Sequence, residues 1–208
     1  MTLFTFLLQV FVISLSGVLP PGPVTAAAIT AGSKKPYAGS LIAIGHCLIE
    51  LPVMLLILFG LDKILKSEKT QIIIGFAGSL VLLIMALQLF VSIKKLTNNT
   101  SEKCKELSPI MTGMALSLSN PYFLIWWASV GLNLAISARD LGIWAFVLFA
   151  LVHWFCDCLW LQIISFTSYK GFSMTGQNFQ KILLCICALT MIFFAGKFFY
   201  YSVSLCLT

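Results

Sequence analysis

Residues 16–24 read SGVLPPGPV and place Pro20, Pro21 and Pro23 inside an apolar segment that runs from about 4 to 31. A proline within a helix has no backbone N–H to donate, and its ring clashes with the preceding turn, so we expect a broken helix here. Carbonyl groups freed in lipid are tolerated only where protein or a water-filled cavity receives them. The stretch therefore predicts a membrane helix that breaks beside a cavity.

The composition supports an all-α integral membrane protein. The chain has 208 residues, of which 60% are hydrophobic and 10% are charged, whereas soluble domains are about 45–50% apolar and about 25% charged. At about 20–25 residues for each crossing, nearly the whole chain lies in or at the lipid bilayer. The net charge of +6 comes from lysines in membrane connections, so no nucleic-acid partner is expected. The N-terminus lacks a basic region and is interpreted as a retained first helix.

We expect six transmembrane helices arranged as two three-helix repeats. The expected spans are 4–31, 37–60, 71–93, 109–136, 141–167 and 180–206. The fourth span contains the second proline break, at Asn120-Pro121. A polar linker, 97–107, separates a first repeat, 1–96, from a second, 108–208.

Both halves have the same order of features: a span broken at proline, a span with His-x-x-x-acid, and a plain apolar span. Because each half crosses the bilayer an odd number of times, the second half starts on the opposite side and is inverted. Inverted repeats with broken helices and a midplane site are a recurrent transporter architecture. This organisation predicts a transporter.

The distribution of basic residues predicts the orientation in the cell membrane. One side holds eight of them: Lys34, Lys35, Lys94, Lys95, Lys103, Lys105, Lys170 and Lys181. The other side holds five: Lys63, Lys66, Lys69, Arg139 and Lys197. Because basic residues are enriched on the cytoplasmic side, both termini are expected outside.

Two His-x-x-x-acid pairs are the main candidates for a coupling site: His46 with Glu50, and His153 with Asp157. Residues four apart share a helix face, and an ionisable side chain at mid-membrane costs about 2.5–3.5 kcal/mol on insertion scales. Three chemistries suit the four side chains: proton binding, contact with a cationic substrate group, or ligation of a divalent metal. The structural alternative is hydrogen bonding that locks the helices together.

The proline breaks supply the candidate substrate site, because a break creates a new helix N-terminus that favours anions and a C-terminus that favours cations. The candidate substrate-binding residues are Pro21, Gly22, Pro23, Asn120, Pro121 and Trp126. Trp126 is included for stacking on the substrate, and the other interpretation of this residue is an anchor near the membrane interface. The serines beside the breaks are expected to bond the freed carbonyls: Ser14, Ser16, Ser117 and Ser119.

The seven cysteines contain no C-x-x-C and are interpreted as unpaired thiols in apolar runs. The pairs Cys156-x-Cys158 and Cys185-x-Cys187 do not share a helix face, which argues against a membrane redox carrier. We therefore expect no cofactor and no enzymatic activity.

Four stretches in order, SGVLPPGPV (16–24), GHCLIELPV (45–53), LSNPYFLIWW (118–127) and HWFCDCLW (153–160), resemble the LysE-type translocators, the lysine-exporter family. The last stretch is similar to archaeal-type members. The resemblance implies proton-linked efflux of amino acids or similar small metabolites, with a homodimer left open. The wider superfamily also implies an alternative, export of divalent transition metals by the same His/carboxylate set. The chain departs from the thiol carriers of that superfamily, because its first and fourth helices lack cysteine.

Overall fold

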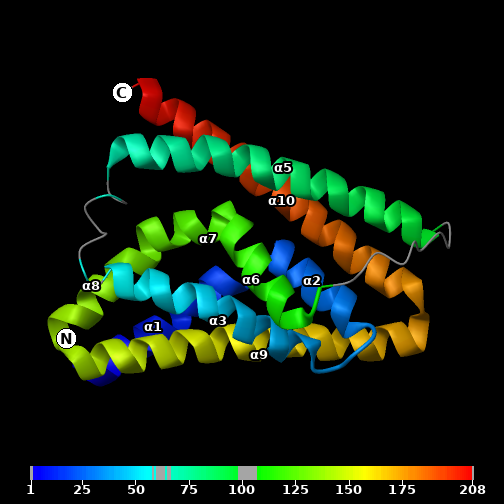
Figure 1. Cartoon of the computed structure of the whole chain (residues 1–208), viewed down its shortest axis with the longest axis horizontal. Coiled ribbons are helices and arrows are strands. Elements are labelled where there is room, and N and C mark those ends of the chain that lie inside the picture. Colours follow the sequence, from blue (N-terminus) through cyan, green and yellow to red (C-terminus); the bar gives the residue numbers. More distant parts are fainter. Residues whose placement is uncertain (1, 58, 60–63, 65–66, 98–106, 208) are drawn as a thin grey trace.

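The computed structural model describes residues 2–57, 59, 64, 67–97 and 107–207, and this part of the chain is helical without strands (Figure 1). Four helices are long and apolar enough to cross a membrane, and two bent helix pairs raise the number of spans to as many as six. The expected all-α membrane fold with breaks in the first and fourth spans is therefore confirmed. Most of the predicted linker, residues 98–106, lies outside the described residues.

The first broken span consists of α1 (Leu3–Val18) and α2 (Pro23–Gly32), which are bent by 77° relative to each other. The Leu19 N–H closes the last turn of α1, and the prolines that follow have no N–H to continue the ladder. Gly22 then adopts an extended conformation as the N-cap of α2, and Pro23 takes the first helical position. Proline is favoured there because its fixed φ suits a helix start.

The second broken span contains four consecutive helical pieces. These are α6 (Pro109–Ser119), α7 (Pro121–Trp126), the π-helical turn η2 (Trp127–Gly131) and α8 (Leu132–Leu141). The part after the break is bent by 62° from α6. Asn120 has extended backbone at the break, and its side-chain oxygen accepts a hydrogen bond of 3.1 Å from the Tyr122 N–H. Asn120 therefore ends one helix and caps the next.

The four continuous spans are α3 (Ala38–Leu56), α5 (Glu68–Thr97), α9 (Ile143–Thr175) and α10 (Gln177–Leu207). Pro52 lies inside α3 without ending it. The 30 residues of α5 extend over about 45 Å. This length exceeds the hydrocarbon thickness of about 30 Å, so α5 and the similarly long α9 and α10 cross with tilt or protrude from the bilayer.

The packing brings the two sequence halves into contact. In Figure 1, α5 and α10 run side by side along one flank of the molecule, and they pack extensively against each other. On the other flank α1 packs against α9, while α3 packs against both α6 and α9. Each broken helix thus contacts the histidine-bearing helix of the opposite half, which places the breaks beside the two pairs.

Glycines permit the closest of these approaches. A Cβ at Gly45 of α3 would collide with the Ile110 carbonyl of α6, and a Cβ at Gly113 of α6 would collide with the Ile42 carbonyl of α3. The contact is therefore reciprocal, backbone against backbone. On the other side of α3, Gly39 lies against the backbone of α9, where the absence of a side chain lets the two helices approach closely.

We expect Gly113→Ala to destabilise the folded protein by roughly 1–3 kcal/mol, because the added methyl group has to push α3 away from α6. The measurement is thermal unfolding of the purified protein in detergent. Gly196→Ala in α10 is the matched control, since no described residue lies within 4 Å of a Cβ at that position. Equal melting temperatures for the two variants would contradict the close α3–α6 contact.

Candidate functional site

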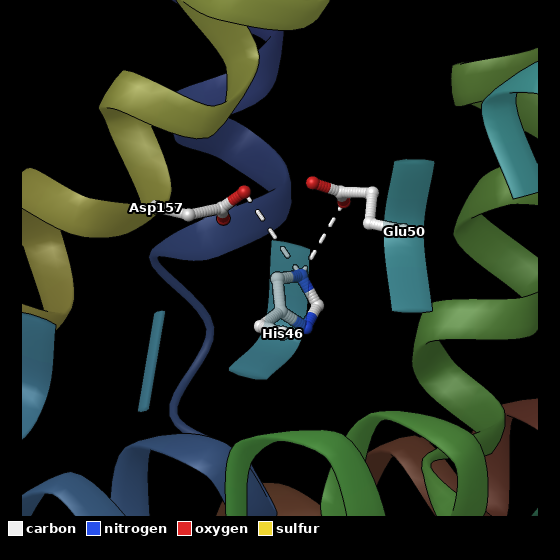
Figure 2. Close-up of side chains that lie close together, drawn as sticks. All are labelled: His46, Glu50 and Asp157. Atoms are coloured by element: carbon white, nitrogen blue, oxygen red, sulfur yellow. Dashed lines mark ion pairs between the residues drawn. The ribbon is translucent and has the colours of Figure 1, made fainter. Parts of the chain in front are cut away.

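The two His-x-x-x-acid pairs form a single cluster, because α3 carries His46 and Glu50 and packs against α9, which carries His153 and Asp157. His46 Nε2 lies 3.3 Å from Glu50 Oε1 and 3.9 Å from Asp157 Oδ2, as Figure 2 shows. His153 Nε2 lies 3.0 Å from Glu50 Oε1 and 3.7 Å from Asp157 Oδ2. Both histidines therefore direct the same ring nitrogen at both carboxylates.

Glu50 is the buried centre of this cluster, with only 1% of its surface exposed. Three nitrogen atoms surround its Oε1 atom: the two histidine Nε2 atoms and Trp127 Nε1, which donates a hydrogen bond of 3.2 Å. A buried carboxylate is stabilised when N–H donors replace the water it has lost. Glu50 is thus held by groups from α3, α9 and the π-helical turn η2.

Asp157 has a different environment, although it stands at the corresponding place in the second half. It is 5% exposed, and its Oδ2 atom is buried without a hydrogen-bond partner in the part of the chain that the structure describes. The two histidine nitrogens, at 3.7 and 3.9 Å, are too far away for hydrogen bonds. A buried carboxylate oxygen without a donor is costly and calls for an explanation.

Two serines hold the histidines from the opposite half. His153 Nδ1 lies 2.7 Å from Ser14 Oγ of α1, and His46 Nδ1 lies 2.6 Å from Ser117 Oγ of α6. The prediction that Ser14 and Ser117 bond carbonyls freed by the prolines is therefore wrong. The sequence feature that indicates the serine–histidine contacts is the repeated Ser-Leu-Ser, at 14–16 and 117–119, shortly before each break.

The remaining serines of the two motifs also bond elsewhere than expected. Ser16 Oγ donates to the Ile13 carbonyl, and Ser119 Oγ donates to the Ala115 carbonyl. Both acceptor carbonyls lie one turn earlier in the same helix. They are not the carbonyls beside the break that the prolines were expected to free. Hydroxyl groups in apolar helices usually satisfy themselves in this local way.

The hydrogen bonds of Ser117 determine which nitrogen atom of His46 carries a proton. Ser117 Oγ donates its only proton to the Gly113 carbonyl at 2.6 Å, so His46 Nδ1 has to donate its own proton to Ser117 Oγ. The titrating position of His46 is then Nε2, the atom that faces Glu50 and Asp157. This geometry places an imidazole nitrogen beside two carboxylate oxygens, which are groups between which a proton can pass.

The cluster opens into a cavity of about 90 Å³. Nine of the ten predicted site residues line it: Pro21, Gly22, Pro23, His46, Glu50, Asn120, Trp126, His153 and Asp157. Trp126 stacks on the His153 ring at a centroid distance of 4.9 Å and an interplanar angle of 19°. The tenth predicted residue, Pro121, provides the first residue of α7, and its side chain lies outside what the structure describes.

Part of the set also has the arrangement of a metal site. One ligand atom from each of His46, Glu50 and Asp157 lies within 4.8 Å of the other two. His153, the fourth predicted metal ligand, does not belong to this group of three residues. Imidazole and carboxylate ligands suit several divalent cations. The six described cysteines are free, in agreement with unpaired thiols, and Cys104 lies outside the described residues.

The comparison with protein-family models identifies one family. The model described as LysE type translocator matches residues 15–202, a range that covers both broken spans and all four residues of the cluster. Neither the curated proteins nor the solved structures contain a match to the chain.

The hydrogen bond to Glu50 gives a test of the site geometry. We expect Trp127→Phe to lower the free energy of unfolding by about 1–3 kcal/mol more than Trp126→Phe, because only the first change removes a donor from a buried carboxylate. Both variants lose the same side-chain volume, and Phe at position 126 can still stack on His153. Thermal unfolding in detergent measures the difference, and equal losses would show that Trp127 does not support Glu50.

Proposed function

The chain belongs to the LysE type translocator family, and we propose that it is a proton-coupled exporter. Members of this family are membrane exporters of amino acids or similar solutes and are not enzymes. In this proposal one amino acid or similar small metabolite binds in the cavity between the two halves. The halves 1–96 and 108–208 then rock against each other to expose the cavity to each side of the bilayer in turn. The observation that carries the proposal is the contrast between Glu50 Oε1, which three nitrogen atoms surround, and Asp157 Oδ2, which has no hydrogen-bond partner among the described residues.

Asp157 is proposed as the exchangeable group of the site. Its Oδ2 atom is buried, lacks a donor among the described residues, and belongs to a residue that lines the cavity. A substrate ammonium group would supply the missing donor with a charge-assisted hydrogen bond. A proton would satisfy the same oxygen when the substrate is absent, so substrate and proton compete for one atom. This competition is the physical basis proposed for the coupling.

Glu50 is proposed as a fixed countercharge. Three nitrogen atoms lie within 3.3 Å of its Oε1 atom, so a substrate would have to displace an existing partner to reach it. Its negative charge lies beside the Nε2 atoms of His46 and His153 and would attract a positive charge on either ring. The histidines thus relay or tune protons, while their Nδ1 atoms stay anchored on serine.

The proline breaks are proposed to receive the other end of the substrate. The N-terminus of α2, at Gly22-Pro23, lines the cavity and has no side-chain cap. Its unsatisfied N–H groups and the positive end of the helix dipole favour a carboxylate. Asn120 uses its carboxamide oxygen to cap α7, which leaves its carboxamide nitrogen as the donor it can offer.

A divalent-metal exporter is the second candidate function, because three ligand atoms of His46, Glu50 and Asp157 lie within 4.8 Å of one another. The metal would then be the transported substrate. Nickel, cobalt, manganese and zinc should each be tested for thermal stabilisation of the purified protein. Stabilisation that is lost in His46→Ala would support this candidate over amino-acid export, and its absence with all four metals would exclude it.

We expect Asp157→Asn to abolish both amino-acid-induced thermal stabilisation and export from proteoliposomes, while the variant protein still folds. The amide removes the negative charge but keeps the shape, and the native Oδ2 atom has no hydrogen bond to lose among the described residues. Glu50→Gln should instead lower the melting temperature without ligand, because it replaces an acceptor shared by three nitrogen atoms.

Asp140→Asn serves as the control for the loss of one carboxylate charge. Asp140 has a side chain that is 66% exposed and pairs only with the neighbouring Arg139 among the ion pairs of the described residues. It should export like the unmodified protein across a series of pH values. Export by Asp157→Asn that equals the unmodified protein at every pH would overturn the proposed coupling role.

A further inference from the structure

Two further hollows adjoin the central cavity, one toward each end of the bundle. A hollow of about 370 Å³ is lined by residues that include Gln71, near the start of α5, and Tyr201, near the end of α10. A hollow of about 400 Å³ lies at the opposite end of α5, around Ser92, and includes Thr112 of α6. We name them the terminal hollow and the opposite hollow, because both chain termini lie toward the first (Figure 1).

Each hollow shares wall residues with the central cavity. Phe194 borders both the cavity and the terminal hollow. Pro23 and Met191 border both the cavity and the opposite hollow. Along α10, Met191 borders the opposite hollow and the cavity, Phe194 borders the cavity and the terminal hollow, and Tyr201 borders the terminal hollow.

An aromatic cluster forms the wall toward the terminal hollow. The Tyr122 ring at the start of α7 lies 5.0 Å from the Phe194 ring and 6.3 Å from the Phe198 ring, centroid to centroid. Phe194 and Phe198 are 6.0 Å apart. Tyr122 directly follows the Asn120-Pro121 break, so a change in the bend at that break would move one member of the cluster relative to α10.

We propose that the opposite hollow, the central cavity and the terminal hollow form one transport path, closed toward the terminal hollow by the aromatic gate of Tyr122, Phe194 and Phe198. This inference rests on the proposed export function and adds the route and its barrier. The terminal side is the side expected to face the cell exterior, so the gate is the exit barrier. In the structure the centroids of the three rings lie 5.0–6.3 Å apart, which we take as the closed state of this gate.

The polar groups of the terminal hollow fit the carboxylate end of a departing solute. Lys197 lines it and is solvent-exposed, with its ammonium group 5.8 Å from the Phe193 ring centre. The Tyr201 hydroxyl donates to Gln71 Oε1 at 2.9 Å, which fixes the Gln71 amide and leaves its NH₂ group as a donor. The central cavity offers a carboxylate for the ammonium end, and the terminal hollow offers donors for the carboxylate end.

Two serines give a matched pair for testing the route. Ser129 lines the terminal hollow and Ser92 the opposite hollow; both are exposed, and both donate to the carbonyl four residues earlier. A membrane-impermeant thiol reagent is applied to one side of sealed vesicles containing Ser129→Cys or Ser92→Cys, and peptide mass spectrometry locates the label. We expect the two cysteines to react from opposite sides. Grooves filled with lipid would leave both unreactive, and this result would overturn the path.

The gate is tested by Phe194→Ala in each cysteine variant. Removing this ring should let the reagent applied on the terminal side reach Ser92→Cys. Phe193→Ala is the matched control, because Phe193 is its neighbour on the same helix but is 61% exposed and does not line any of the three spaces. A labelling pattern that is the same in both alanine variants would show that Phe194 is not a barrier.

Lys197→Gln tests the solute chemistry. Export of an amino acid should fall about tenfold, as for loss of one charge-assisted contact, while export of the corresponding decarboxylated amine should not change. Lys181→Gln, near the other end of α10, is the control. An equal fall for both solutes would overturn the carboxylate role.

Thermal stabilisation of the unmodified protein by amino acids distinguishes a failure of the proposed function from a failure of the proposed route. If stabilisation is absent, the proposed function fails. If stabilisation is present but Ser129→Cys is unreactive from both sides, only the route fails.

Discussion

A carboxylate buried away from water has to be surrounded by N–H donors, and the arrangement around Glu50 follows from this constraint. Trp127 Nε1 and the Nε2 atoms of His153 and His46 all converge on its Oε1 atom. To bring them there, α9 and the π-helical turn η2 have to meet α3 in the middle of the bundle. The serines that contact the histidine rings lie in the helices that lead into the breaks, Ser14 six residues before Pro20 and Ser117 four residues before Pro121, so each of these helices is tied to the same carboxylate.

Much of this architecture could be predicted from the sequence because its signals are local or repeated. Pro23 and Pro121 mark the breaks by backbone chemistry alone, and the convergence of the two pairs followed from their matching places in the two halves of the sequence. The different roles of Trp126 and Trp127 could not be predicted in this way. A π-helical turn begins at Trp127 and changes the direction of successive side chains, and the hydrophobic pattern carries no mark of that wider turn.

Glu50 and Asp157 also differ for a reason that the repeated His-x-x-x-acid spacing does not indicate. Glu50 receives a hydrogen bond from the broken span of the second half, where α7 and η2 bring an indole to the cluster. The corresponding helix of the first half, α2, reads PVTAAAITAG and places small residues such as Ala26 and Ala28 in the packed interior. These side chains have no N–H to offer Asp157. A repeated motif therefore produces one fixed and one open carboxylate, because the surroundings of the repeat are not themselves repeated.

The crossed serine–histidine contacts have a consequence for how such a chain can change over generations. His46 and Ser117 are 71 positions apart, and Ser14 and His153 are 139 positions apart, yet each pair shares a hydrogen bond. A substitution at a serine alters the ring position of a histidine encoded in the other half of the gene. A change at one of these four positions is therefore expected to require a compensating change at its distant partner, so the site depends on residues encoded from position 14 to position 153.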